Sequence, residues 1–148
     1  MISFVDTPGF MVGPDSEKEG AFRRMGELFK HGARIRTPLV GIILRRGYGL
    51  GAMAMMGGSF VDPIYSASWP NGEFGGMGLE GYVKLGFKKE LEAEETEEKK
   101  KALFDKLVAR MYEVGKATEA AAHLEVDAVI DPACTRETIL KAFKSFGA

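Results

Sequence analysis

A glycine-rich stretch offers main-chain groups that could bind an anion. Residues 45–58 read Arg-Arg-Gly-Tyr-Gly-Leu-Gly-Ala-Met-Ala-Met-Met-Gly-Gly. Glycine lets a backbone take unusual dihedrals and approach a ligand closely, and from Gly51 onward alanine and methionine favour a helix. The first amides of a helix have no partner inside it, and the helix dipole adds positive charge there. The stretch therefore predicts a helix start that holds a phosphate or a developing oxyanion, with a ligand-free tight turn as the alternative.

The elements around this stretch are expected to repeat. The apolar run 39–44 follows Pro38 and predicts a buried strand before the glycines. A second apolar run, 64–69, is followed by the glycine-rich passage 75–81 and a helical pattern. The unit of strand, glycine turn and helix thus occurs over 39–57 and again over 64–86. Two such backbone concavities at the same ends of adjacent strands would frame one pocket.

The N-terminal segment predicts a strand and a helix. The run 2–5 is apolar and reads as a strand, whose sheet neighbours must come from later in the chain or from another molecule. Ser16 and Glu19 fit a capping box for a helix that carries an apolar face and ends before Pro38.

The C-terminal half is expected to be helical. Residues 88–101 are almost all charged, and Thr96 can cap a helix whose first turn carries Glu97, which would pair with Lys101. That helix carries a broad apolar stripe over 103–112. An alanine-rich helix over 117–124, a short extended segment over 129–132 and a last helix capped by Thr135 follow. Together these features predict an α/β fold, with residues 1–148 forming a single domain without an internal linker.

Three isolated side chains invite a chemical role, and each has a simpler structural reading. His31 lies within the first helical pattern and fits a surface or half-buried position better than catalysis. Trp69 fits a core or pocket wall better than a stacking platform. Cys134 could be a nucleophile, but no histidine lies nearby in sequence, and a helix cap explains the site.

Composition narrows the function classes. Of the 148 residues 45% are hydrophobic and 28% are charged, and the formal net charge is −1. No basic stripe suggests nucleic acid or an anionic membrane as a partner, and no apolar run reaches membrane-spanning length. A single cysteine excludes an internal disulfide and a cysteine-rich metal site. We expect no bound metal. We also expect a cytoplasmic location, since no secretory signal is found.

Four ordered motifs give the chain a family resemblance. They are Phe4-Val5-Asp6-Thr7-Pro8-Gly9-Phe10, Arg45-Arg46-Gly47-Tyr48-Gly49-Leu50-Gly51-Ala52, Trp69-Pro70-Asn71-Gly72-Glu73 with Gly76-Met77-Gly78, and Asp127-Ala128-Val129-Ile130-Asp131-Pro132 followed by Thr135-Arg136. The sequence resembles the carboxyltransferase (β) subunits of biotin-dependent acyl-CoA carboxylases, such as propionyl-CoA carboxylase. The resemblance covers nearly all of this chain but only the C-terminal part of the family's second, biotin-side domain.

The resemblance implies a crotonase-like partial domain and carboxyl transfer between carboxybiotin, borne on a carrier protein, and an acyl-CoA. This chain would supply the biotin-side half of the site within a homo-oligomer, together with a biotin carboxylase and its biotin carrier protein. Family members stabilise the negative charge on the biotin ureido oxygen with backbone amides at the glycine turn. Here the implied oxyanion donors are the amides of Leu50 and Gly51. Gly49 and Ala52 would line the biotin site, together with Gly76, Met77 and Gly78.

One departure leaves the register of these donors open. The commonest family pattern is Gly-Gly-Ala, whereas Leu50 stands here where a glycine is usual. Two alternatives to the transferase also remain: a non-catalytic assembly module of the same fold, and a subunit of a biotin-dependent acyl-CoA decarboxylase.

Overall fold

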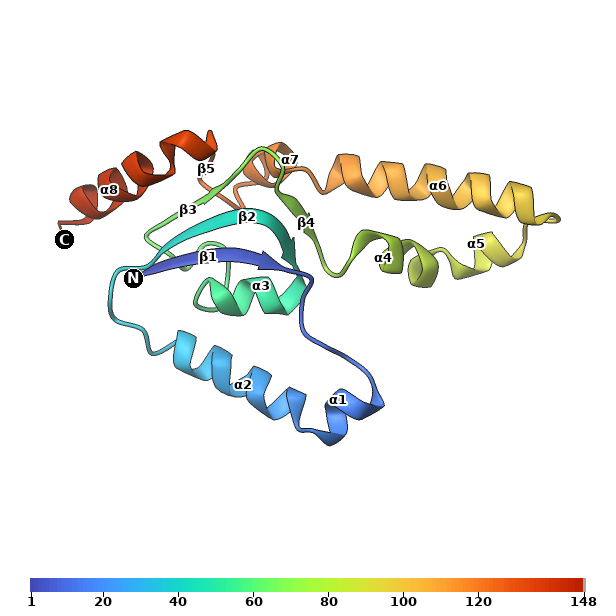
Figure 1. Ribbon diagram of the computed structural model, residues 1–148, viewed down its shortest axis with the longest axis horizontal. Helices are drawn as coiled ribbons and strands as arrows, with labels where there is room; N and C mark the ends of the chain where they lie inside the picture. The colour runs from blue at the N-terminus through green and yellow to red at the C-terminus, as the bar shows by residue number, and fades with distance from the viewer. Residues whose placement is uncertain (148) are drawn as a thin grey trace.

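A parallel β-sheet forms the centre of the computed structural model, which describes residues 1–147 (Figure 1). Its strands are β1 (Ile2–Thr7), β2 (Val40–Tyr48), β3 (Tyr65–Ser68), β4 (Glu73–Gly75) and β5 (Ala128–Val129). The order is β1-β2-β3-β5, and β4 pairs with the far end of β2. Every pairing between these strands is parallel, so their carboxyl ends point the same way. The predicted α/β class is confirmed.

Helices cover both faces of the sheet, as a parallel sheet requires. They are α1 (Pro14–Lys18), α2 (Ala21–Gly32), α3 (Gly49–Met55), α4 (Leu79–Gly86), α5 (Lys88–Glu92), α6 (Glu97–Val114), α7 (Ala117–Ala122) and α8 (Thr135–Phe146), with a 3₁₀ turn at Pro132–Cys134. In Figure 1, α3 lies directly beneath β1 and β2 with α2 outside it, whereas α8 crosses the opposite face.

Strand β2 supplies both hydrophobic cores because its side chains alternate. Val40 and Ile42 are fully buried against α8. Ile43 is fully buried on the other face, in a core with Ala52 and Met56 of the α3 region. The sheet therefore holds α3 rigidly at the carboxyl end of β2.

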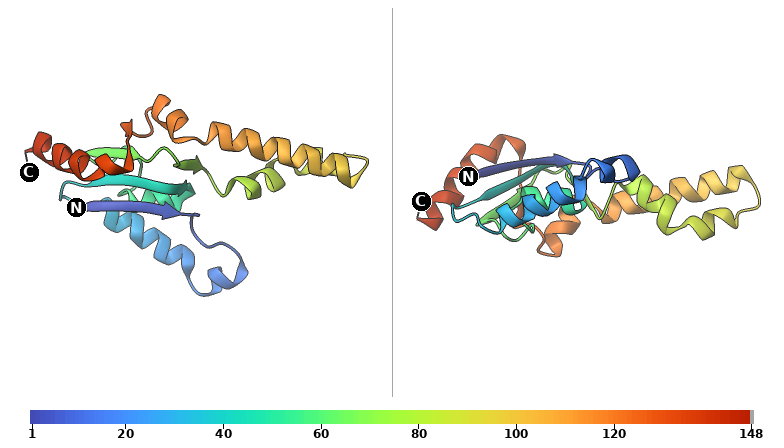
Figure 2. Two further views of the ribbon diagram at one scale, coloured as in Figure 1. Left: turned by 45° about the horizontal axis from the view of Figure 1, so that its top comes forward. Right: turned by 90° about the horizontal axis from the view of Figure 1, so that it is seen from below.

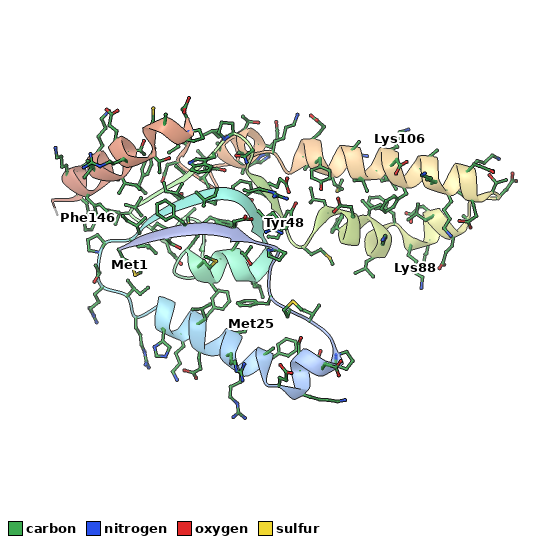
Figure 3. The ribbon with its side chains drawn as sticks, viewed as in Figure 1. Met1, Met25, Tyr48, Lys88, Lys106 and Phe146 are labelled. Atoms are coloured by element: carbon green, nitrogen blue, oxygen red, sulfur yellow. The ribbon has the colours of Figure 1, made fainter. Side chains whose placement is uncertain are left out.

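Helices α4, α5 and α6 project beyond the sheet as an arm in every view (Figures 1 and 2). Half-buried side chains of α6 face α4 and α5, which confirms the predicted apolar stripe. Lys88 and Lys106 lie on opposite outer sides of the arm (Figure 3). Thr96 caps α6 as predicted, since its Oγ1 accepts the Lys99 amide at 3.2 Å. Glu97, however, pairs with Lys100 rather than with Lys101.

Several predicted boundaries are wrong for local reasons. Ser16 is not a helix cap: α1 already begins at Pro14, whose ring favours the first turn, and Gly20 separates it from α2 in a left-handed conformation. Thr135 does not cap α8, because its hydroxyl instead donates to the Pro132 carbonyl at 2.7 Å.

Two strand predictions also change. Strand β2 continues to Tyr48 rather than ending at Leu44, and β4 forms where a loop was expected. The second strand–glycine–helix unit is therefore β4 and α4, since β4 rather than β3 precedes Gly76. Both changes place the two helix starts beside each other. Within residues 1–147, no helix is long and apolar enough to cross a membrane.

Candidate active site

Helix α3 begins immediately after β2, without a connecting loop. Gly49 makes the sharp turn with a φ of +58°, a left-handed value that an L side chain rarely adopts. Tyr48, the N-cap residue, is still extended. Along the first turn, Leu50 is 57% exposed, whereas Gly51 and Ala52 are buried. The first turn therefore presents one face to solvent and one to the protein.

The amides of Leu50 and Gly51 are two of the four at this helix start that have no carbonyl partner within the helix. Both precede the first residue whose N–H can reach a carbonyl within the helix. Among residues 1–147, neither amide donates a hydrogen bond outside the helix. The Ala52 methyl is fully buried in the core, in contact with the α3 side of the sheet. Two adjacent donors at a helix N-terminus can bind an oxygen that carries negative charge.

The loop after β1 packs against Gly51. A Cβ on Gly51 would lie 2.9 Å from the Gly9 Cα and 3.1 Å from the Phe10 nitrogen. Thr7 fixes this loop, because its Oγ1 accepts the Gly9 amide at 3.2 Å. The Phe10 amide donates no hydrogen bond in the part of the chain that the structure describes. Only glycine at position 51 permits this close approach.

The loop after β4 packs against Gly49 on the other side. A Cβ on Gly49 would lie 2.6 Å from the Gly76 carbonyl oxygen. Tyr48 and Gly75 are register partners in the β2–β4 ladder, so the two glycine turns leave the sheet side by side. The two turns thus lie at the same ends of adjacent strands, although the strand before the second turn is β4 rather than the predicted run 64–69.

Two hollows flank this second loop. One, of about 380 Å³, is lined by Gly49, Met53, Gly75, Gly76 and the segment 59–61. The other, of about 410 Å³, is lined by Gly76 and Met77 together with parts of α4, α6 and α7. Leu50, Gly51 and Ala52 line neither hollow. Gly78 is the N-cap residue of α4 and also lines neither.

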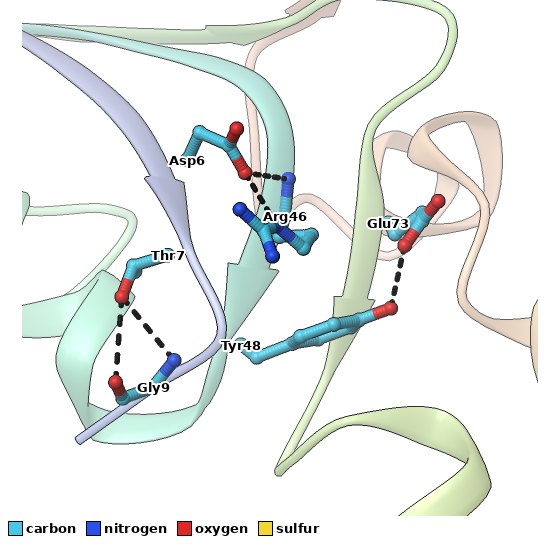
Figure 4. A network of polar contacts seen from close by, with 6 residues as sticks. All are labelled: Asp6, Thr7, Gly9, Arg46, Tyr48 and Glu73. Atoms are coloured by element: carbon cyan, nitrogen blue, oxygen red, sulfur yellow. Dashed lines mark hydrogen bonds and ion pairs between the residues drawn. The ribbon is translucent and has the colours of Figure 1, made fainter. Parts of the chain in front are cut away.

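Polar side chains connect the three strands that end here (Figure 4). The Asp6 Oδ1 accepts two hydrogen bonds from Arg46, from the backbone N–H at 3.2 Å and from Nε–H at 2.7 Å. The Tyr48 hydroxyl donates to the Glu73 Oε2 at 2.6 Å. Asp6 belongs to β1, Arg46 and Tyr48 to β2, and Glu73 to β4.

These contacts shift the titration of the groups involved. The Arg46 side chain, by hydrogen bonding, lowers the pKa of the Asp6 carboxyl below its usual value. Burial, assisted by the hydrogen bond to Glu73, raises the pKa of the Tyr48 hydroxyl well above its usual value. At neutral pH Asp6 is therefore ionised, and Tyr48 keeps the proton that it donates.

The predicted site residues fall into two neighbouring groups. Gly49, Leu50 and Gly51 form the helix start, and Gly76 touches it. Met77 and Gly78 continue away from it toward α4. The sequence analysis included these residues in its motifs but gave no site role to the loop at Gly9 and Phe10 or to the polar pairs of Figure 4. The Asp-Thr-Pro-Gly motif was the available signal for the loop and for Asp6, since its Thr7 and Gly9 form the turn beside Gly51.

The other side chains considered lie elsewhere. His31 is exposed on α2, and Cys134 is exposed beside α8. Trp69 packs beside the α8 core and donates its indole N–H to the Thr135 hydroxyl at 3.0 Å, which confirms the core reading. Over the described residues no group of three or more His, Cys, Asp or Glu side chains is placed to hold a metal ion.

Comparison with known proteins identifies a consistent set of relatives. Residues 1–146 match the carboxyl transferase domain family. A propionyl-CoA carboxylase beta chain from Saccharopolyspora erythraea is 33% identical, over 97% of this chain and 27% of the relative. The chain spans about a quarter of the length of the curated relatives that it matches.

Solved structures agree. A single-chain, multi-domain long-chain acyl-CoA carboxylase is 54% identical with a TM-score of 0.81, covering 95% of this chain and 14% of that one. The transcarboxylase 12S hexamer, with methylmalonyl-CoA bound, is 28% identical with a TM-score of 0.85, covering 99% of this chain and 28% of that one. The predicted crotonase-like fold is thereby confirmed.

Proposed function

Because the chain belongs to the carboxyl transferase domain family, we propose that it supplies the biotin-side half of a carboxyltransferase site. The reaction is carboxyl transfer between carboxybiotin and an acyl-CoA. The observation that carries this proposal is the start of α3, where the amides of Leu50 and Gly51 lack partners and the Gly9 and Gly76 loops close in on either side.

The residues at this helix start fit a group that gains negative charge. Glycine at positions 49 and 51 lets the Gly76 and Gly9 loops pack directly against the turn, which fixes the position of the Leu50 and Gly51 amides. Bound carboxybiotin supplies the carboxyl group. The Leu50 and Gly51 N–H groups would donate hydrogen bonds to the oxygen that gains negative charge as the carboxyl group leaves. The Phe10 amide, beside Gly51, is a further donor within reach of the same place.

Rigid donors suit this task. Backbone amides held by a buried sheet need no reorganisation as charge develops. Removing one such donor typically lowers the rate by about 100- to 1000-fold. Gly76 and Met77, with Gly49, would shape the wall next to the ring, because they line the adjoining hollows.

The proposal extends to partners. The acyl-CoA would bind mainly to another part of the enzyme, as this chain spans only a quarter of its relatives. A biotin carboxylase and its carrier protein would deliver the carboxyl group in the cytoplasm. The arm exposes Leu85 (68%), Val114 (62%) and Tyr82 (44%), an apolar surface that fits contacts within a homo-oligomer.

Reconstitution tests this function. The 148-residue chain is mixed with the remainder of the Saccharopolyspora erythraea beta chain, and carboxylation of propionyl-CoA and of a long-chain acyl-CoA is measured with a carboxylated biotin carrier protein. We expect a rate above that of either component alone, lowered about 100-fold by Gly51→Val, because the new side chain meets the Gly9 main chain and displaces the donor amides. No carboxylated product with either substrate, from a mixture that forms a stable complex, would refute the transferase and favour an assembly module.

A further inference from the structure

We propose that Asp6–Arg46 and Tyr48–Glu73 are positioning pairs, which hold the loops on either side of α3 so that the Leu50 and Gly51 amides converge. The inference rests on the proposed function for its catalytic consequence. Its geometric content stands without it.

The first pair repairs an irregularity in the sheet. The β1–β2 register shifts between Val5, which pairs with Ile43, and Thr7, which pairs with Gly47. Residues in such a bulge lose regular ladder partners. At this irregularity the Asp6 carboxylate, rather than a backbone carbonyl, accepts the hydrogen bond of the Arg46 backbone N–H. It also accepts one from the Arg46 side chain. One carboxylate thus fixes where β1 ends against β2.

The end of β1 sets the position of the loop beside Gly51. Thr7 follows Asp6 directly and binds Gly9 through its hydroxyl. Gly9 in turn touches the space next to Gly51, where no Cβ fits. A movement of Asp6 would therefore displace the Phe10 amide through the three residues between them. Asp6 bonds Arg46 and neither donor amide, so its effect on them is indirect.

The second pair does the same for the other loop. Tyr48 is 4% exposed and is the last residue before α3, so its phenol is anchored at the root of the helix. Its partner Glu73 begins the short strand β4. Three residues later, Gly76 places its carbonyl against Gly49. The bond between Tyr48 and Glu73 therefore joins the start of α3 to the strand that leads into its second wall.

Together the two pairs link three strands, β1 to β2 and β2 to β4. Arg46 and Glu73 are register partners on β2 and β4, so the pairs lie next to each other (Figure 4). Strand β4 has only three residues, and Asp6 lies at an irregular pairing. Backbone ladders alone hold both walls weakly, so side-chain bonds have most to contribute there.

Nuclear magnetic resonance on the intact chain tests the geometry without turnover. We expect Asp6→Ala to move the amide resonances of Phe10 and Gly51, and to lower their order parameters from about 0.85 toward 0.6. Asp6→Asn, which keeps an acceptor oxygen, should restore part of the change. The amide of Ile42, deep in β2, should not move.

Matched variants elsewhere act as controls. Glu137→Gln breaks a carboxylate–cation pair of the same 2.7 Å length on α8 and should leave Gly51 unchanged. Tyr112→Phe removes the other phenol–glutamate bond, 2.7 Å to Glu80, for comparison with Tyr48→Phe. We expect Tyr48→Phe to shift Gly49 and Gly76, and Tyr112→Phe to shift neither.

The outcomes separate the two proposals. In the reconstituted enzyme, Asp6→Ala should lower kcat by about 10- to 100-fold with little change in KM for the acyl-CoA. If wild type is inactive but the resonances move as described, the function fails and the positioning stands. If Gly51 and Phe10 do not respond to Asp6→Ala, or if Ile42 responds equally, the positioning role is overturned. Should Asp6→Ala not fold, the same measurements on Asp6→Asn and Tyr48→Phe decide it.

Discussion

Replacing Gly51 by alanine is the sharpest test of the packing around α3. The new Cβ would stand 2.9 Å from the Gly9 Cα and carbonyl carbon, whereas ordinary contact begins at 3.4 Å. The obstacle is main chain, so the loop must retreat by about half an ångström or the helix must tilt. Such overpacking costs about 1–3 kcal/mol. Alanine regains about 0.5–1 kcal/mol in a helix.

The net expectation is a loss of about 1–2 kcal/mol in the free energy of unfolding. For a chain of this length, this lowers Tm by about 2–8 °C. A displacement of about half an ångström at the donors should lower the transfer rate by about tenfold, since about 1 Å can cost 100-fold. Calorimetry and the reconstituted assay measure the two effects separately.

Gly26→Ala is the matched control. Gly26 lies in the middle of α2, and nothing stands within 4 Å of its Cβ position. This variant should gain about 0.5–1 kcal/mol and keep the wild-type rate. If Gly51→Ala also becomes more stable and keeps full activity, then the loop at Gly9 does not confine the helix start, and the reasoning is wrong.

Three further predictions concern neighbouring positions. Gly49→Ala should lower the free energy of unfolding in urea by about 2–4 kcal/mol, which is more than Gly51→Ala, because a φ of +58° and the Gly76 carbonyl at 2.6 Å both oppose a side chain. A loss equal to or smaller than that of Gly51→Ala would contradict this. Arg46 lowers the pKa of Asp6 in the folded chain below the unfolded pKa of 3.8. The ionised carboxylate therefore stabilises the fold at pH values above 3.8, and this contribution is lost as the pH falls through the lower pKa of the folded chain. Asp6→Asn should therefore be less stable than wild type at pH 7, by no more than about 1 kcal/mol since the pair is over a third exposed, and the gap should close toward pH 3 in unfolding curves. Met56→Ala should cost about 2–5 kcal/mol because the side chain is fully buried, and a loss under 1 kcal/mol in the same unfolding assay would show that the core collapses around the cavity.

Sequence patterns located the helix start because the signals there are local. The apolar run ending at Leu44, the glycines and the alanine–methionine stretch all act within a few residues. The cap at Thr96 and the stripe of α6 were predictable for the same reason. The capping roles expected of Ser16 and Thr135 failed because a residue nearby, Pro14 or Pro132, offered a competing local solution.

The pairings that build the walls of the site are not local and could not be predicted. Strand β4 has three residues and pairs with Arg46–Tyr48, the part of β2 that stays extended beyond the predicted end at Leu44. Its Phe74 amide bonds the Gly115 carbonyl at 2.7 Å, a contact across 41 positions. The residues near position 74 in the sequence do not indicate this contact. The proximity of Gly49 to Gly76 follows from the pairing of β4 with β2.

The same geometry explains why leucine is compatible with position 50. The side chain at that position points outward and is 57% exposed, so its size is unrestricted. Position 51 faces the Gly9 loop, and position 49 needs a left-handed φ, so both require glycine. The sequence alone does not show which of positions 49, 50 and 51 must be glycine. The fold does, because the space that a Cβ would occupy differs at each position. Glycine at positions 49 and 51 with a side chain at position 50 is therefore compatible with this helix start, and residue 50 keeps its donor N–H with any side chain except proline.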